Sequence, residues 1–334
     1  MPGRTIAAAA FLTVLAAPAA AEMSAAQTST AQGWPNRPLT MVVTYAAGGT
    51  TDIIARIIGT RLSEVLKQQI VIENVGGAGG MTGAARVAKA PADGYQFVLG
   101  NVGTHAQNQT LYKSPSYNAA TDFAAVGLLV DLPMLMVSRT TLPPNDLKEF
   151  IAYAKTNQAK MQYGSAGTGA PTHLACALLN VAMGVNITHV PYRGSALALQ
   201  DMIGGRIDYH CLNASAAIQH IEAKNAKAIT MTTKERSAAF PDIPTAHEQG
   251  LKDFVAENWL AFFFPKGTPA TIVQRLNEAA IAAMMTPAVM EQLKKNGAEI
   301  VAPERRTPEY LQKFVASEIE KWAGPIKAAG LSGN

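Results

Sequence analysis

Short apolar, strand-like runs alternate with segments of helical periodicity along most of the sequence. Leu39–Thr44 is the first such run, and apolar residues then recur at helical spacing from Ile53 to Leu66. Ile70–Glu73 and Tyr95–Leu99 repeat the strand pattern. Strands that alternate with helices in this way are typical of parallel sheets covered by helices. The alternation therefore predicts an α/β fold with parallel sheets.

Two long apolar runs divide this alternation. Phe123–Ser138 is interrupted by Pro133, and Glu257–Phe264 ends at the turn Pro265–Pro269. A second block of strands and helices lies between the two runs, and the sequence after them is mostly helical. We therefore predict two α/β lobes joined by a two-strand hinge. Residues 34–130 and 257–334 would form the first lobe, and residues 131–256 the second.

The first 21 residues have the pattern of a secretory signal peptide. A positive charge at Arg4 precedes the apolar run Ile6–Ala17, which is too short to span a membrane, and Ala19–Ala21 supplies small residues for cleavage. We expect cleavage near Ala21 and export to the periplasm. Residues 22–33 are polar and rich in small side chains, which predicts a flexible leader.

The sequence contains two cysteines, Cys176 and Cys211. In an oxidising periplasm they can form a disulfide, and the alternative is a pair of buried free thiols. Sequence leaves this choice open, because the distance between the two residues decides it. No Cys or His pair has the spacing of zinc ligands, so we expect no metal site.

Composition limits the classes of partner. Hydrophobic residues make up 48% of the sequence and charged residues 16%, an ordinary globular balance. The formal net charge is +4, and the densest basic pairs are Lys294–Lys295 and Arg305–Arg306. A nucleic-acid partner would need a basic stripe, so none is expected. We also expect no cofactor, and a monomer.

Two glycine-rich loops lie where a strand ends and a helix begins, at Tyr45–Asp52 and at Gly164–Thr172. Helix N-termini present unpaired N–H groups and the positive end of the helix dipole, and glycine lets a ligand approach the backbone closely. Such glycines are also common for packing reasons alone. Two such loops on facing lobes nevertheless predict a site that binds one small anion at both of its ends.

Three charged or titratable residues near these loops have two interpretations each. Asp52 either caps the helix as a first-turn acid, which we favour, or receives the ammonium group of a ligand. Arg193 either binds a carboxylate or forms a salt bridge with a neighbour such as Asp201. His105 follows a strand and either borders the cleft or lies on the surface.

Other patterns have stronger structural explanations. The Gly77–Gly83 loop resembles a dinucleotide fingerprint, but Thr82 stands where a glycine is needed, so close helix–sheet packing explains it better. Ser165 and His173 suggest a serine hydrolase, but the flanking residues lack the first glycine of the nucleophile elbow. Trp259 and Phe262–Phe264 are expected to fill the core rather than to wall a cleft.

A series of short motifs occurs in an order that resembles one protein family. They are Trp34–Pro38, Ala47–Asp52 with Ala55–Arg56, Asn74–Gly80, Pro91–Tyr95, Gly103–His105, Tyr163–Gly169 with His173–Leu174, Val190–Ser195, Gly204–Asp208 and Pro265–Pro269. Their order is similar to that in the substrate-binding proteins of tripartite tricarboxylate transporters, the TctC-like or Bug proteins. The resemblance covers Trp34 to Gly330.

The resemblance implies a type II periplasmic binding-protein fold with the ligand cleft between the lobes. It implies that a carboxylate is held by main-chain groups and ordered water at the first loop. By motif match the ligand-binding residues would be Tyr45, Ala46, Ala47, Gly48, Gly49, Thr50, Thr51 and Asp52, then Gly103, Thr104 and His105, and in the second lobe Ser165, Ala166, Gly167, Thr168, Thr172 and Arg193. Relatives often carry an aromatic residue and an acid where this sequence has His210–Asn213.

These patterns predict a periplasmic receptor without catalytic activity. It would capture a small carboxylate, such as a di- or tricarboxylate or an aromatic carboxylate. The resemblance further implies that it delivers this solute to the integral membrane subunits of a tripartite transporter. Two rivals remain at this point: a solute sensor that presents its closed form to a signalling receptor, and an exported serine hydrolase that uses Ser165.

Overall fold

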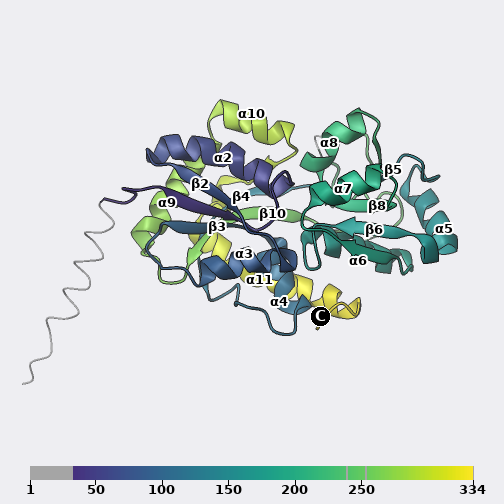
Figure 1. Ribbon diagram of the computed structural model, residues 1–334, viewed down its shortest axis with the longest axis horizontal. Helices are drawn as coiled ribbons and strands as arrows, with labels where there is room; N and C mark the ends of the chain where they lie inside the picture. Colours follow the sequence, from purple (N-terminus) through teal and green to yellow (C-terminus); the bar gives the residue numbers. More distant parts are fainter. Residues whose placement is uncertain (1–32, 238–239, 253, 334) are drawn as a thin grey trace, which may run out of the picture. The chain divides into compact units, whose positions relative to one another are not determined.

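A computed structural model describes residues 33–237, 240–252 and 254–333 of the chain (Figure 1). The predicted signal peptide and almost all of the predicted leader lie outside the described residues. Residues 35–334 form one structural unit, and the fold described below is that of this unit. Within its described part, no helix is long and apolar enough to cross a membrane.

The first sheet has six strands in the order β11-β4-β10-β3-β1-β2. Their bounds are β1 Leu39–Val43, β2 Ile70–Asn74, β3 Gln96–Asn101, β4 Phe123–Leu132, β10 Asn258–Pro265 and β11 Glu299–Ile300. Strand β1 is parallel to both β2 and β3. Strand β10 is antiparallel to β3 and β4, and β11 is antiparallel to β4.

The second sheet has five strands in the order β7-β6-β8-β5-β9. Their bounds are β5 Met134–Arg139, β6 Gln162–Ser165, β7 Thr188–Pro191, β8 Tyr209–Asn213 and β9 Ala226–Met231. Strand β6 is parallel to β7 and β8, whereas β5 is antiparallel to β8 and β9.

The predicted α/β class is confirmed, but the expectation of purely parallel sheets is wrong. Parallel pairing holds for strands that a local helix connects, as in β1–β2 and β6–β7. The strands that come from the other lobe, β5 and β10, run against their neighbours. Alternation along the sequence reports only the local crossover connections, so it could not predict the direction of these strands.

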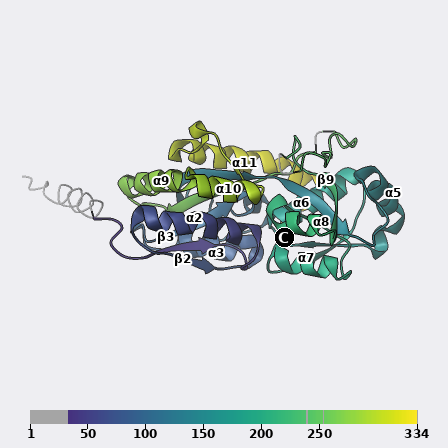
Figure 2. The ribbon, with the colours of Figure 1, turned by 90° about the horizontal axis from the view of Figure 1, so that it is seen from above.

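Helices cover both faces of the first sheet. Their bounds are α2 Thr50–Leu66, α3 Met81–Ala88, α4 Asn108–Leu111, α9 Ala270–Met284, α10 Pro287–Lys295 and α11 Pro308–Ala328, with short turns η1 Ala78–Gly80, η2 Gly103–Gln107 and η4 Pro303–Arg305. Helices α2, α9 and α10 lie on one face, and α3 and α11 lie on the other (Figures 1 and 2). In α2 the predicted periodicity is borne out, because Ile54, Ile58 and Leu62 are fully buried.

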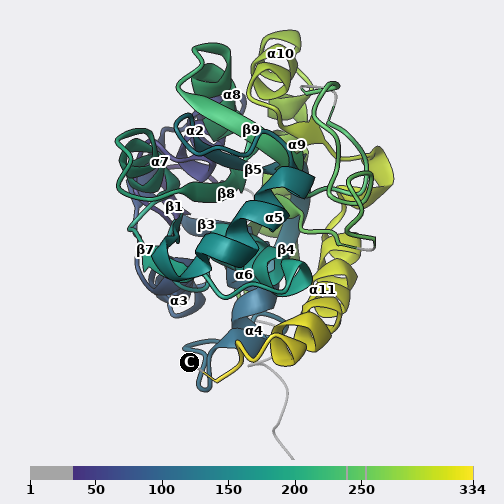
Figure 3. The same ribbon diagram turned by 90° about the vertical axis from the view of Figure 1, so that its right-hand side faces the viewer.

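The second sheet is covered in the same way. Its helices are α5 Leu147–Asn157, α6 Pro171–Met183, α7 Ser195–Ile203 and α8 Ala214–Glu222, with the turn η3 Gln158–Lys160. Helices α7 and α8 pack on one face, and α5 and α6 on the other (Figure 3). A side chain caps the start of α5, since the Asp146 carboxylate accepts a hydrogen bond from Glu149 N at 2.8 Å.

The chain changes sheets at a single residue, Pro133. Leu132 at the end of β4 pairs with Asn258 in the first sheet, and Met134 at the start of β5 pairs with Asn213 in the second. Proline has no N–H to donate, so it separates the two hydrogen-bonded ladders. The return crossing ends at Asn258, where β10 begins. Two strands therefore join the lobes, as the sequence predicts.

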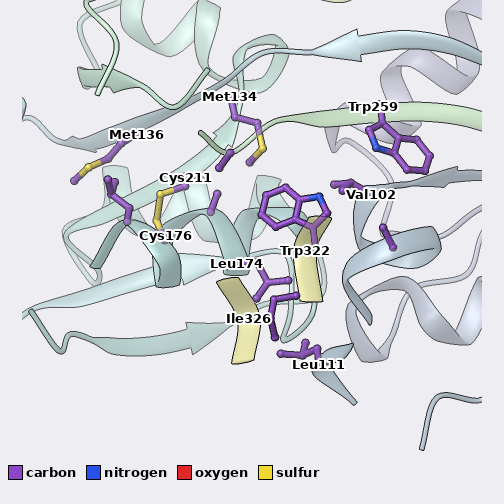
Figure 4. Close-up of a cluster of buried hydrophobic side chains, with 14 of the residues drawn as sticks. Val102, Leu111, Met134, Met136, Leu174, Cys176, Cys211, Trp259, Trp322 and Ile326 are labelled. Atoms are coloured by element: carbon purple, nitrogen blue, oxygen red, sulfur yellow. A yellow bond between two sulfur atoms is a disulfide. The ribbon is translucent and has the colours of Figure 1, made fainter. Parts of the chain in front are cut away.

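Cys176 on α6 and Cys211 on β8 form a disulfide, which decides the alternative that the sequence left open. Both residues are fully buried. Figure 4 shows the bond within a hydrophobic cluster that also contains Met134, Leu174 and Trp322. The predicted core role of the aromatic strand also holds, because Trp259 is 3% exposed and Phe262–Phe264 are at most 1% exposed.

Removal of the disulfide should destabilise the protein without unfolding it. Cys176 and Cys211 are 35 residues apart in sequence, and a closed loop of that size contributes roughly 3–4 kcal/mol on the chain-entropy model. We expect the double variant Cys176→Ser, Cys211→Ser to show a correspondingly lower free energy of unfolding in urea. A reducing agent should lower the stability of the wild type but leave that of the variant unchanged. Equal stability of variant and wild type would contradict this account.

Candidate functional site

A small cavity of about 20 Å³ lies where the two lobes meet. Its lining comes from strand ends and helix starts: Tyr45, Gly49, Thr50, Thr51, Asn101, Ala166, Pro171, Thr172, Ser195, Asn213 and Asn258. Among the described residues, those that line it are all uncharged. Polar contact with a ligand would therefore come from hydroxyl groups, amide groups and the backbone.

Four helices from both lobes begin at this cavity. Gly49 precedes the first turn of α2, Ala170 that of α6, Gly194 that of α7, and Asn213 that of α8. None of these four residues makes a side-chain capping hydrogen bond. First-turn N–H groups generally lack an intrahelical acceptor, and they carry the positive end of the helix dipole. At two of these helices the set is smaller, because Pro171 has no N–H and Ala214 N donates to the Pro133 carbonyl at 2.8 Å. The arrangement therefore concentrates positive potential on a cavity without charged side chains.

The lobes touch around the cavity. Ser215 on α8 donates a hydrogen bond to Thr50 on α2 at 2.9 Å, and Tyr112 donates one to the Thr168 carbonyl at 2.9 Å. Gly79 lies so close to the second lobe that an added Cβ would be 2.4 Å from the Thr168 carbonyl oxygen. A cavity of about 20 Å³ has room for about one water molecule. As it stands, the cavity therefore has no room for a larger solute.

The first predicted loop is held by Tyr45 and Asn101. The Tyr45 hydroxyl donates to the Gly79 carbonyl at 3.0 Å and accepts from the Asn101 side chain at 3.2 Å. Burial raises the pKa of Tyr45 well above its usual range, and the Asn101 hydrogen bond opposes that rise only in part. The hydroxyl is therefore a neutral donor and acceptor at any physiological pH.

Asp52 acts on the loop rather than on the cavity. Its carboxylate accepts hydrogen bonds from Gly48 N, from Asn74 Nδ2 and from two nitrogens of Arg56, all at 3.0 Å. Burial alone would raise the pKa of Asp52, but the hydrogen bonds from Arg56, Gly48 and Asn74 outweigh it and lower that pKa. A carboxylate offers about four acceptor sites, so no site is left for a ligand ammonium group. The favoured interpretation as a first-turn acid therefore agrees with the geometry.

The second predicted loop contains a serine–histidine contact that the sequence did not reveal. Ser165 Oγ lies 2.7 Å from His189 Nε2, not beside His173, and it also accepts a hydrogen bond from Gly167 N at 3.0 Å. The Ser165 side chain is fully buried. A hydroxyl engaged in this way shapes the loop and is not presented to a substrate.

The structure divides the predicted residues into two groups. Those that line the cavity are Tyr45, Gly49, Thr50, Thr51, Ala166 and Thr172. Those outside its lining are Ala46, Ala47, Gly48, Asp52, Gly103, Thr104, His105, Ser165, Gly167, Thr168 and Arg193. Gly103, in the second group, lies where the lobes meet: an added Cβ there would be 2.8 Å from Pro171 Cδ of the other lobe.

His105 differs from both interpretations that the sequence suggested, whereas for Arg193 only the salt bridge with Asp201 is excluded. His105 is fully buried and stacks on Phe263 with 3.8 Å between ring centroids, so it lies neither at the surface nor at the cavity. Arg193 is exposed, and its carbonyl accepts from Ala46 N at 3.4 Å across the lobes. Asp201 instead binds Tyr192 and Arg206.

The lining residues that the sequence analysis missed are Asn101, Pro171, Ser195, Asn213 and Asn258. A signal was available for most of them. Asn101 and Asn213 end strands β3 and β8, and Ser195 begins α7. In α/β sheets ligands bind outside the carboxyl ends of the strands, so polar residues at these positions were candidates. Asn258 could not be found this way, because it lies at the start of the antiparallel strand β10.

Two lobes, a two-strand hinge and a polar cavity between the lobes define the class of periplasmic solute-binding proteins. Residues 54–331 match the model of the tripartite tricarboxylate transporter family receptor, and the chain belongs to this family. The proteins of this family and fold bind solutes and are not enzymes. The resemblance that the sequence motifs indicated is thus confirmed.

Relatives match nearly the whole chain. A UPF0065 protein of the TAR-I ttuE-ttuC' intergenic region of Agrobacterium vitis is 41% identical over 297 residues, which cover 89% of this chain and 86% of the relative. BugT of Bordetella pertussis is 33% identical over 301 residues, which cover 90% of this chain and 91% of BugT.

Solved structures show the same fold. The periplasmic binding protein BugD is 38% identical, with a TM-score of 0.87 and coverage of 90% of this chain and 100% of BugD. MatC of Rhodopseudomonas palustris with bound malate has 37% identity and a TM-score of 0.85, covering 88% and 100%. Rpa4515 of R. palustris with adipate has 36% identity and a TM-score of 0.86, covering 90% and 100%.

Three buried histidines and the half-buried His189 predict a loss of stability in acid. Burial lowers the pKa of His105 and His189 to about 3 and that of His173 and His210 to about 4, from 6.5. Because the folded-state pKa values are depressed, their contribution is complete above pH 6.5 and is lost as the pH falls toward 4. At pH 5.5, unfolding should take up close to one proton per histidine.

Calorimetry in buffers of different ionisation enthalpy would measure this proton uptake, and urea unfolding at several pH values would give the stability. A free energy of unfolding that stays constant between pH 7 and pH 4.5 would show that these histidines are not held neutral.

Proposed function

We propose that this protein is an exported receptor that captures a small dicarboxylate between its lobes and delivers it to the membrane subunits of a tripartite transporter. One observation carries the proposal: four helix N-termini without side-chain caps, from both lobes, meet at one cavity lined by uncharged polar residues. Unpaired N–H groups at helix starts are well suited to bind carboxylates.

The division of the donors between the lobes favours a ligand with two anionic ends. Helix α2 belongs to the first lobe, and α6, α7 and α8 belong to the second. A dicarboxylate of four to six carbons can present one carboxylate to each lobe. The relatives with malate and adipate carry ligands of this class, which supports the same class here. Amino acids are disfavoured, since the Asp52 carboxylate is already fully hydrogen-bonded.

The remaining predicted positions are part of this proposal. Tyr45, Thr50, Thr51 and Thr172 would contact the ligand directly. Gly48, Asp52, Ser165 and the other residues behind the loops would hold those contacts in place. Export by the signal peptide, with cleavage near Ala21, places the receptor in the periplasm, where we propose that it acts as a monomer.

Thermal unfolding against a panel of carboxylates tests capture. Malate, succinate, adipate, citrate, benzoate and aspartate would each be added, and a ligand at a hundredfold its dissociation constant should add about 2.7 kcal/mol of stability. We expect shifts with the dicarboxylates, and a smaller shift with aspartate than with succinate, which differs from it by the ammonium group. If no carboxylate shifts the transition, the receptor hypothesis is wrong.

A matched pair of variants at Ser195 sharpens this test. Ser195→Asp places a negative charge at the first turn of α7, inside the cavity lining, where it should repel a carboxylate and weaken binding about tenfold or more. Ser195→Asn is nearly isosteric with that variant but neutral, and it should bind within a few-fold of wild type. An acid at a helix start stabilises the helix, so weaker binding by Ser195→Asp would not reflect unfolding.

Uptake of a radiolabelled dicarboxylate by cells tests delivery. Deletion of the receptor gene should abolish high-affinity uptake, and a plasmid copy with Ser195→Asn should restore it while Ser195→Asp should not. Normal uptake in the deletion strain would refute delivery. A carboxylate-dependent response that needs the receptor but survives deletion of the transporter genes would instead support the sensor.

A further inference from the structure

Three histidines lie together beneath the second loop, and none of them lines the cavity. His173 is on α6, His189 on β7 and His210 on β8. The ring centroids of His173 and His189 are 4.2 Å apart. The Tyr163 ring stacks against both of them and against Tyr209. Side chains from three separate elements therefore converge on one short segment of backbone.

Each histidine hydrogen-bonds to a different part of the loop Gly164–Gly169. His210 Nδ1 lies 2.8 Å from the Gly164 carbonyl oxygen, so it must donate a proton there. His189 Nε2 lies 2.7 Å from Ser165 Oγ, which in turn accepts from Gly167 N. His173 Nδ1 accepts from Gly169 N at 3.3 Å, so this nitrogen carries no proton. Together the three rings bind the beginning, the middle and the end of the loop.

The loop needs such support because its backbone is unusual. Gly167 and Gly169 have φ angles of 122° and 85°, in the region that other residues rarely adopt. The N–H groups of these two residues are the ones that Ser165 and His173 satisfy. Ala166, within the loop, and Thr172, at the helix start that follows it, both line the cavity. A further bond, from Ala166 N to Thr172 Oγ1 at 2.8 Å, joins these two lining residues.

We propose that His173, His189 and His210 are positioning residues for the ligand site: as neutral imidazoles they hold the Gly164–Gly169 loop in its binding conformation and do not touch the ligand. This inference rests on the proposed function, because it assigns the three residues to the same site. It requires one defined nitrogen on each ring: Nδ1 as acceptor at His173, Nδ1 as donor at His210, and Nε2 at His189. A role in core packing alone would require only rings of the right volume.

Side-chain amides can test which nitrogen matters. The terminal atoms of asparagine lie near the Nδ1 position of histidine, and those of glutamine lie near Nε2. His173→Asn, His210→Asn and His189→Gln therefore keep the proposed hydrogen bond. The exchanged set has the same chemistry and polarity, but it places the amide group near the other ring nitrogen position. Its members are His173→Gln, His210→Gln and His189→Asn. Each position thus has its own matched control.

Two measurements follow for all six variants. Amide hydrogen exchange at Gly167 and Gly169 in the ligand-free protein reports the loop directly, and titration with malate reports the site. The matched variants should keep loop protection and malate affinity within about threefold of wild type. The exchanged variants should lose about tenfold or more in both, because a buried partner is left unsatisfied. Retained thermal stability would show that these losses are local.

The outcomes separate this inference from the proposed function. If matched and exchanged variants behave alike at each position, whether both are intact or both impaired, the positioning role is refuted. If wild type does not bind malate or any other carboxylate, the proposed function fails, and hydrogen exchange still decides whether the histidines position the loop. Faster loop exchange with unchanged malate affinity would also refute the inference, since the loop would then not control the site.

Discussion

The N–H groups in the first turns of helices α2, α6, α7 and α8 impose the main constraint on this structure. Their helices begin at one place because strands β1, β6, β7 and β8 all end there, and each strand leads directly into one of these helices. Buried donors of this kind must find an acceptor. Side chains cap α5 and α11, but they cap neither these four helices nor α3, α9 and α10. Part of the requirement is met by the backbone, since Ala214 N donates to the Pro133 carbonyl at 2.8 Å and His173 N to the Ala170 carbonyl at 2.9 Å. In the proposed receptor, the N–H groups that remain are left for a ligand.

The hinge allows N–H groups from both lobes to surround a single acceptor. A single residue, Pro133, separates the hydrogen-bonded ladder of the first sheet from that of the second. The chain re-enters the first sheet at Asn258, which pairs with Leu132 next to Pro133. Asn258 also hydrogen-bonds to Asn213 at the start of α8, so the crossing strands reach the cavity wall itself. The antiparallel strands that the lobes exchange therefore link the hinge directly to the cavity wall.

Sequence reasoning predicted the parts of this structure that depend on local periodicity. It found the helices, the two crossings and the two loops, since patterns such as Ile54–Ile58–Leu62 and the break at Pro133 report local geometry. It did not find the direction of β10, the pairing of Ser165 with His189 or the burial of His105, because each depends on a contact between distant segments. The motif match named two loops that contribute to the cavity lining, but not which of their residues line it. That distinction depends on closure of the lobes.

The uncharged lining of the cavity has a consequence for release. A site built on an arginine would keep its full charge in one lobe after opening, and the solute would stay bound there. In the proposed receptor the donors would be peptide and hydroxyl dipoles shared between two lobes. When the lobes separate, each lobe keeps only its own donors, and water replaces those that the solute has lost. In the proposed receptor, opening and unloading are therefore a single event, without titration or displacement of any side chain.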